Sequence, residues 1–99
     1  MNTYMILFGF TDQGIRNIKE SPARVEAAKE TVRAMGGEMK DFYGILGHPH
    51  YDTIFIFDAP DEEAVAKMVL AIAAGGNVRT ETHRLFREDE YREVVSGLP

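Results

Sequence analysis

Residues 3–10, TYMILFGF, and residues 51–58, YDTIFIFD, decide the fold of this 99-residue chain. Both segments are rich in aromatic and branched side chains, which suit a pleated and buried strand. In the first segment, both alternating rows are largely apolar: Tyr4, Ile6, Phe8 and Phe10 on one face, and Thr3, Met5, Leu7 and Gly9 on the other. In the second, Tyr51, Thr53, Phe55 and Phe57 share one face. Such strands belong at the centre of a sheet with both faces covered.

The remaining segments alternate between helical and extended patterns. Two helices are predicted from apolar residues at spacings of three and four, namely Val25, Ala28, Val32 and Met35, then Val65, Met68, Val69 and Ile72. The first helix is expected to start at Pro22 with Ser21 as its cap, and glycine pairs end both helices. Residues 38–46 and 77–86 are predicted strands, and residues 88–98 form a short C-terminal helix.

The resulting order is β-α-β-β-α-β, which is the split pattern of a ferredoxin-like fold. Right-handed crossovers place both helices on one face of the antiparallel sheet, so helices leave the second face bare. A contiguous exposed apolar patch of that size is unusual on a monomer. The sequence therefore predicts a single α+β domain, residues 1–99, that pairs through its sheet with a second copy as a dimeric α+β barrel.

The amino-acid composition limits the classes of partner that the chain is expected to bind. Its 11 Lys and Arg against 16 Asp and Glu give a net charge of −5, whereas nucleic-acid binding requires a basic surface. The absence of cysteine excludes disulfides, thiolate metal sites and cysteine nucleophiles. The longest apolar stretch is far below the ~20 residues that span a bilayer, and no signal peptide is evident. We expect a cytoplasmic protein with no nucleic-acid partner, no membrane partner and no cofactor.

Several short motifs resemble those of the GYD family of small bacterial proteins. The similarity extends from about Thr3 to Phe86, and its most specific pieces are Gln13-Gly14, Ile18-Lys19-x-Ser21-Pro22-x-Arg24, Tyr51-Asp52 and Gly76-Asn77-Val78-Arg79-Thr80-x-Thr82. The resemblance implies a ferredoxin-like fold assembled as a dimeric α+β barrel, and it implies no activity. The family's usual glycine stands two residues before the tyrosine. Here Gly47-His48-Pro49-His50 precedes Tyr51, so the hairpin is longer by two residues.

Two groups of polar residues are candidates for a site. Asp52, beside Tyr51, is either an acid–base carboxylate or a turn cap that binds backbone N–H groups, with the cap favoured. On the fourth strand, either Arg79, Glu81 and His83 or Thr80, Thr82 and Arg84 line the open face of the sheet, and the alternation leaves both possible. His48 and His50 are expected to be turn residues without a metal, because a closed zinc site needs about four ligands.

Three functions fit these patterns. The first is a homodimer that binds a small apolar or aromatic molecule carrying a polar handle. The second is a cofactor-free enzyme, isomerase-like or monooxygenase-like, with Asp52 and His83 as catalytic candidates. The third is a structural or regulatory dimer without a pocket.

Strands three and four lie about 10 Å apart across the first strand, so any ligand is predicted to contact Tyr51, Arg79 or His83.

Overall fold

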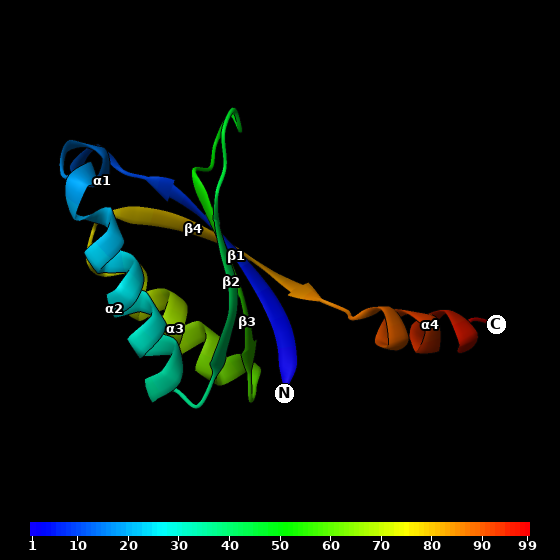
Figure 1. The fold of residues 1–99 in the computed structure, drawn as a ribbon. Helices are drawn as coiled ribbons and strands as arrows, with labels where there is room; N and C mark the ends of the chain where they lie inside the picture. Colours follow the sequence, from blue (N-terminus) through cyan, green and yellow to red (C-terminus); the bar gives the residue numbers. More distant parts are fainter.

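The computed structural model describes residues 1–99 as a four-stranded antiparallel sheet with two long helices against one side (Figure 1). The strand order is β2-β3-β1-β4, which confirms the predicted ferredoxin-like topology. The elements are β1 (Asn2–Phe10), α1 (Asp12–Arg16), a 3₁₀ turn η1 (Ile18–Glu20), α2 (Ser21–Ala34), β2 (Glu38–Gly44), β3 (Thr53–Ala59), α3 (Glu62–Ala73), β4 (Val78–Leu85) and α4 (Glu88–Ser96).

The core lies between the sheet and the pair α2 and α3. Alternate side chains of the central strands point toward the helices and are buried, as the sequence pattern predicts. From the helices, Val32 and Met68 are fully enclosed against them. The strand contributions are Tyr4, Ile6, Phe8, Phe55, Phe57 and Ala59. Only 13 of the 99 residues are buried, so the core of an isolated chain is small and its stability limited.

Several predicted boundaries differ from the structure, and two of the differences concern residues named above. Ser21 is the first residue of α2 rather than its cap, because the 3₁₀ turn η1 runs directly into the helix and Glu20 takes the cap position. Strand β3 begins at Thr53, so Tyr51 and Asp52 belong to the end of the hairpin. This second difference frees the Tyr51 side chain from the alternation of the strand.

The pairing of β4 with β1 decides which row of β4 faces away from the helices. Glu81 pairs with Leu7 and His83 with Met5, whereas Thr82 pairs with buried Ile6. Arg79, Glu81 and His83 therefore lie on the side of the sheet opposite α2 and α3. We call this side the open face; its apolar residues are Met5, Leu7, Ile54 and Ile56, each partly exposed.

Helix α4 does not pack on the body of the domain. Figure 1 shows it extending away from the sheet, on the side opposite α2 and α3. The longest dimension of the molecule is 51 Å and its radius of gyration is 14.6 Å, against about 13 Å for a compact chain of this length. The apolar stripe of α4 is 45% to 61% exposed. Its members are Tyr91, Val94 and Val95, and Leu98, which the sequence places in the helix, lies beyond its end at Ser96.

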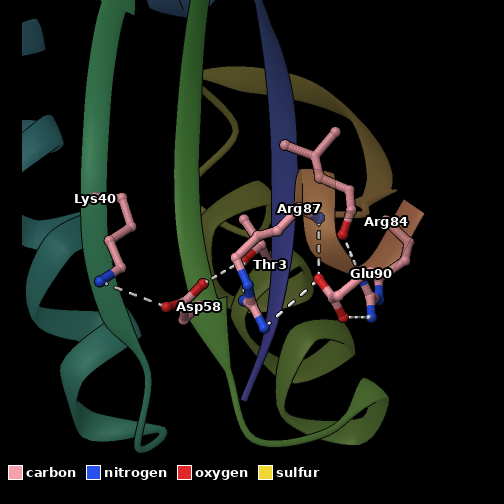
Figure 2. Close-up of polar contacts among 7 residues, drawn as sticks. Thr3, Lys40, Asp58, Arg84, Arg87 and Glu90 are labelled. Atoms are coloured by element: carbon pink, nitrogen blue, oxygen red, sulfur yellow. Dashed lines mark hydrogen bonds and ion pairs between the residues drawn. The ribbon is translucent and has the colours of Figure 1, made fainter. Parts of the chain in front are cut away.

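A chain of polar contacts fixes the point where α4 leaves the sheet (Figure 2). Thr3 donates to Asp58 over 2.6 Å and accepts from the Arg87 guanidinium over 3.1 Å. Glu90, in the first turn of α4, accepts from the Arg87 backbone N–H over 3.0 Å and from Arg84 over 3.2 Å. The direction of α4 is therefore determined by bonds to β1 and β4 rather than by apolar packing.

Candidate functional site

Arg79 crosses over strand β1 at Gly9. Its guanidinium donates to the carbonyl of His50 over 2.5 Å and to the carbonyl of Phe10 over 3.2 Å. A Cβ at Gly9 would lie 2.6 Å from the Arg79 Nη1 and 2.7 Å from the His50 carbonyl oxygen. Gly9 thus provides the space through which Arg79 ties β4 to β1 and to the hairpin before β3.

Tyr51 and His83 converge on Glu81. The Tyr51 phenol donates to Glu81 Oε1 over 3.1 Å, and His83 Nε2 lies 2.8 Å from Glu81 Oε2. The Arg79 guanidinium carbon lies 5.9 Å from the centre of the Tyr51 ring, within cation–π range. We call these four residues the Glu81 cluster. It lies at the β4 edge of the open face, next to the apolar side chain of Leu7.

Hydrogen bonding and burial move the pKa values of two members of the cluster in opposite directions. The pKa of Glu81 is lowered, first by the hydrogen bond from His83 and then by that from Tyr51. The pKa of Tyr51 is raised, first by burial and then by the hydrogen bond to Glu81. At neutral pH the carboxylate is therefore ionised and the phenol protonated. Both pKa values therefore move away from neutral, whereas a general acid or base is most effective when its pKa lies near the working pH.

Asp52 lies outside the cluster and is bonded to the backbone. Its Oδ2 accepts from the Phe10 N–H over 2.9 Å. Its own N–H donates to the Phe8 carbonyl over 2.8 Å, and its carbonyl accepts from the Ile45 N–H over 2.7 Å. The Asp52 carboxylate thus binds a backbone N–H, but one that belongs to β1 rather than to its own turn, so these bonds join the hairpin to β1.

The hairpin histidines shape the turn that presents Tyr51. His48 Nδ1 accepts from the backbone N–H groups of His50 and Tyr51, each over 3.0 Å. The rings of His48 and Tyr51 lie 5.3 Å apart between centres. No three His, Cys, Asp or Glu residues of the structure are placed to hold a metal ion together.

The structure brings together three of the four predicted site residues, namely Tyr51, Arg79 and His83, and adds Glu81 as their common partner. The sequence placed Glu81 in the same row as Arg79 and His83, but alternating charges are also typical of a solvated edge strand. Tyr51 was expected on the face of Phe55 and Phe57. That expectation is wrong, because Tyr51 precedes β3 and its phenol turns to Glu81 on the open face.

This sheet, with two helices on one side and the order β-α-β-β-α-β, defines a ferredoxin-like α+β domain. A family model for the GYD domain matches residues 4–95, and the chain belongs to the GYD family. A relative from Thermus thermophilus is named glutamine synthetase and cystathionine beta-lyase binding protein. It is 32% identical over 83 residues, which cover 83% of this chain and 85% of the relative.

Solved structures of distant sequence share the fold. The 30S ribosomal protein S6 of Thermotoga maritima has a TM-score of 0.62 at 16% identity, over 96% of this chain and 97% of that one. A feast or famine regulatory protein of M. tuberculosis, complexed with L-methionine, has a TM-score of 0.65 at 16% identity over 88% of this chain. The chain spans 51% of the length of that protein. At these identities the likeness concerns the fold alone.

The dehydrochlorinase of Burkholderia phenoliruptrix AC1100 is a further structural neighbour, with a TM-score of 0.62 at 15% identity over 88% of this chain and 96% of that one. It was solved with 2,5-dihydroxybenzoquinone.

None of the helices of the present structure is both long and apolar enough to span a bilayer.

Proposed function

We propose that this GYD-family protein is a homodimeric binding protein. Two copies pack through their open faces, and the Glu81 cluster at the edge of each face holds a small molecule with an apolar or aromatic body and a polar handle. The observation that carries the proposal is the convergence of Tyr51 and His83 on Glu81 beside an uncovered apolar face.

The need for apolar cover supports the homodimer. Met5, Leu7, Ile54 and Ile56 form a continuous apolar centre of the open face, and no element of the same chain covers them. A second copy offers a matching surface, and a two-fold axis makes such a contact self-complementary. Burying this face adds apolar contact that the small core lacks.

The chemistry of the cluster supports the ligand class. Glu81 supplies an ionised acceptor, and the Tyr51 ring supplies an aromatic surface. The Arg79 guanidinium is bonded to backbone carbonyls of His50 and Phe10, so it holds the hairpin in place. A ligand with a hydroxyl or amine donates to Glu81, while its body rests on Tyr51 and the neighbouring apolar face.

A metabolite screen by thermal shift tests the ligand proposal. We expect compounds with an aromatic or apolar body and one donor group to raise the melting temperature of the wild type. The shift should be lost in Glu81→Gln and in the triple variant Tyr51→Phe, Arg79→Ala, His83→Ala. The control is Arg33→Ala on the exposed side of α2, whose guanidinium is paired with Glu30. A hit whose shift persists in the triple variant would place the site elsewhere.

A second candidate function is the binding of another protein. The observation that favours it is the name of the Thermus thermophilus relative, which describes binding to two enzymes. Purified glutamine synthetase and cystathionine beta-lyase, mixed with this protein in size-exclusion chromatography with light scattering, test it. Co-elution at a defined ratio supports this function, and separate elution of all components at micromolar concentration contradicts it. A cofactor-free enzyme gains no support from the pKa directions of the cluster.

A further inference from the structure

The core on the helix side is not evenly filled. A cavity of about 220 Å³ lies between α2, α3 and one end of the sheet, on the opposite side of the sheet from the Glu81 cluster. Figure 1 shows the two helices lying against that side. Aromatic rings of the three strands β1, β2 and β3 form its floor. They are Phe8, Phe10, Phe42 and Phe55.

The choice of residues on the two helices explains the hollow. Toward one end of the core, Val32 of α2 and Met68 of α3 fill the space over Phe57, and all three are fully buried. Toward the other end, the helices present Ala28 and Ala71 to the cavity. Methyl side chains cannot reach across the gap that Val and Met close. The small side chains at these helix positions therefore leave the cavity open.

The floor has a defined aromatic geometry. Phe55 stands edge-to-face against Phe8, with ring centres 4.9 Å apart, and against Phe42, with ring centres 5.3 Å apart. These contacts hold the three rings in fixed orientations. Val25 of α2 and Ile72 of α3 add aliphatic walls. A flat ring that enters the cavity meets aromatic carbon on one side and aliphatic carbon on the others.

Five polar residues line the cavity, and the side chains of three of them are bonded within the chain, whereas Ser21 and Thr53 carry neutral hydroxyls. The Arg24 guanidinium donates to the carbonyls of Asn17 over 3.0 Å and of Gly14 over 3.2 Å. Thr31 donates to the carbonyl of Ala27 over 3.1 Å, and the Asn77 side-chain carbonyl accepts from Gln13 over 3.1 Å. The lining holds no carboxylate, and its guanidinium already donates to two carbonyls, so these groups do not replace the hydration that a charged ligand would lose. The site selects neutral molecules.

We propose that this cavity is a second binding site, separate from the Glu81 cluster, for a neutral molecule of about one aromatic ring. Enclosed apolar cavities of about 150 Å³ in other proteins bind benzene. The present cavity of about 220 Å³ is larger and opens to solvent on one side, where Ala27, Ala71 and Gly75 are exposed. Its occupant carries a single ring with at most a small substituent. The proposal does not depend on the function assigned to the open face.

Titration with benzene and toluene tests the site. In protein labelled at its methyl groups with ¹³C, we expect saturable shifts of the Val25, Ile72 and Val78 methyl signals. The variant Ala71→Phe places a ring in the cavity from an exposed position of α3 and should weaken binding at least tenfold. The control Ala66→Phe lies on the same helix, is exposed and does not line the cavity, so it should bind as the wild type does.

A second cavity-filling variant, Ala28→Leu, keeps the test decisive should Ala71→Phe fold poorly. The variant Glu81→Gln, which keeps the bond from Arg79 to the Phe10 carbonyl, should bind benzene unchanged, and this separates the site from the Glu81 cluster. The absence of saturable shifts in the wild type up to the solubility limit of benzene would overturn the proposal. Equal affinity of the wild type and a folded cavity-filling variant would overturn it as well.

Discussion

Tyr51 donates its phenolic hydrogen bond to Glu81 over 3.1 Å, and this contact holds the hairpin before β3 against the edge strand β4. It also raises the pKa of the phenol, because ionised Glu81 opposes a second negative charge beside it. Burial of the phenol raises the same pKa and is the larger cause. The titration of one tyrosine therefore reports on the geometry of the whole cluster.

We predict that Tyr51 titrates above the usual tyrosine pKa of 10.0. The difference between the ultraviolet titrations of the wild type and Tyr51→Phe isolates this phenol from the other tyrosines. In Glu81→Gln the midpoint should fall, since the charge and acceptor are lost, but it should stay raised by burial. A midpoint that does not move in Glu81→Gln contradicts the contact. The control is Tyr43→Phe, which removes an exposed tyrosine of β2.

The close approach of Arg79 to Gly9 leads to a second prediction. The variant Gly9→Ala places a methyl group 2.6 Å from the Arg79 guanidinium and 2.7 Å from the His50 carbonyl oxygen, so Arg79, the hairpin or β1 must shift. Overpacking of this kind typically costs about 1–3 kcal/mol of unfolding free energy, which urea denaturation measures. The control is Gly44→Ala in β2, where a Cβ meets no atom within 4 Å and stability should hold or rise. Equal stabilities of the two variants would show that Arg79 does not depend on the gap.

The sequence was sufficient for the fold because its strongest patterns are also the energetically dominant ones. Apolar rows on both faces of residues 3–10 place β1 at the centre, next to β3, and the structure confirms this. The helices pack on β1 and β3 through Val32 and Met68, which belong to the apolar stripes of helical period. These contacts bury most of the core, so local patterning and the global fold agree.

The site was less predictable because it depends on positions outside regular structure. Tyr51 lies two residues before β3, where alternation no longer fixes the direction of a side chain. Glu81 belongs to a row of alternating charges, which a solvated edge strand also shows. The cavity was not predictable, because Ala28 on a helix either leaves space or lets the helix approach the sheet, and only the structure distinguishes the two.

The open face gives a third prediction. We expect the protein to form a homodimer at micromolar concentration, as measured by sedimentation velocity. The variant Ile54→Asp should dissociate it, since an unpaired buried charge costs about 3–5 kcal/mol, or on the order of a hundredfold or more in affinity. Phe55 is not suited to this test, because it is buried against the helices and its substitution unfolds the core.

The control for the assembly test is Leu70→Asp on α3. Leu70 is 70% exposed and lies on the helix side of the sheet, so the same chemical change there should leave the dimer intact. A wild type that sediments as a monomer, or an Ile54→Asp variant with unchanged association, would rule out the sheet interface.

Glu90 leads to a fourth prediction, on acid stability. The hydrogen bond from the Arg87 backbone, followed by that from Arg84, lowers the pKa of Glu90 below its usual 4.5 in the folded chain. The unfolded chain takes up the proton first as pH falls, so this contribution is present above about pH 4.5 and lost as pH falls through the folded pKa. The wild type should therefore exceed Glu90→Gln in unfolding free energy at pH 6, and the difference should shrink by pH 3.

Urea denaturation at the two pH values measures this difference. The variant Glu63→Gln serves as control, because Glu63 is exposed on α3 and its ion pair is with Lys67 on the same helix. A gap between wild type and Glu90→Gln that is equal at both pH values would show that Glu90 acts through packing rather than through its charge.

The exposed stripe of α4 gives the last prediction. In an isolated chain, Val94 and Val95 contact solvent, so their replacement by Asn should change stability by no more than about 0.5 kcal/mol. Because α4 projects from the open-face side, we expect a second copy packed on that face to contact the stripe and bury it. The double variant Val94→Asn, Val95→Asn should then raise the dimer dissociation constant at least tenfold. The double variant Arg92→Asn, Glu93→Asn on the same helix should leave it unchanged, and equal dissociation constants for the two variants would show that α4 takes no part in assembly.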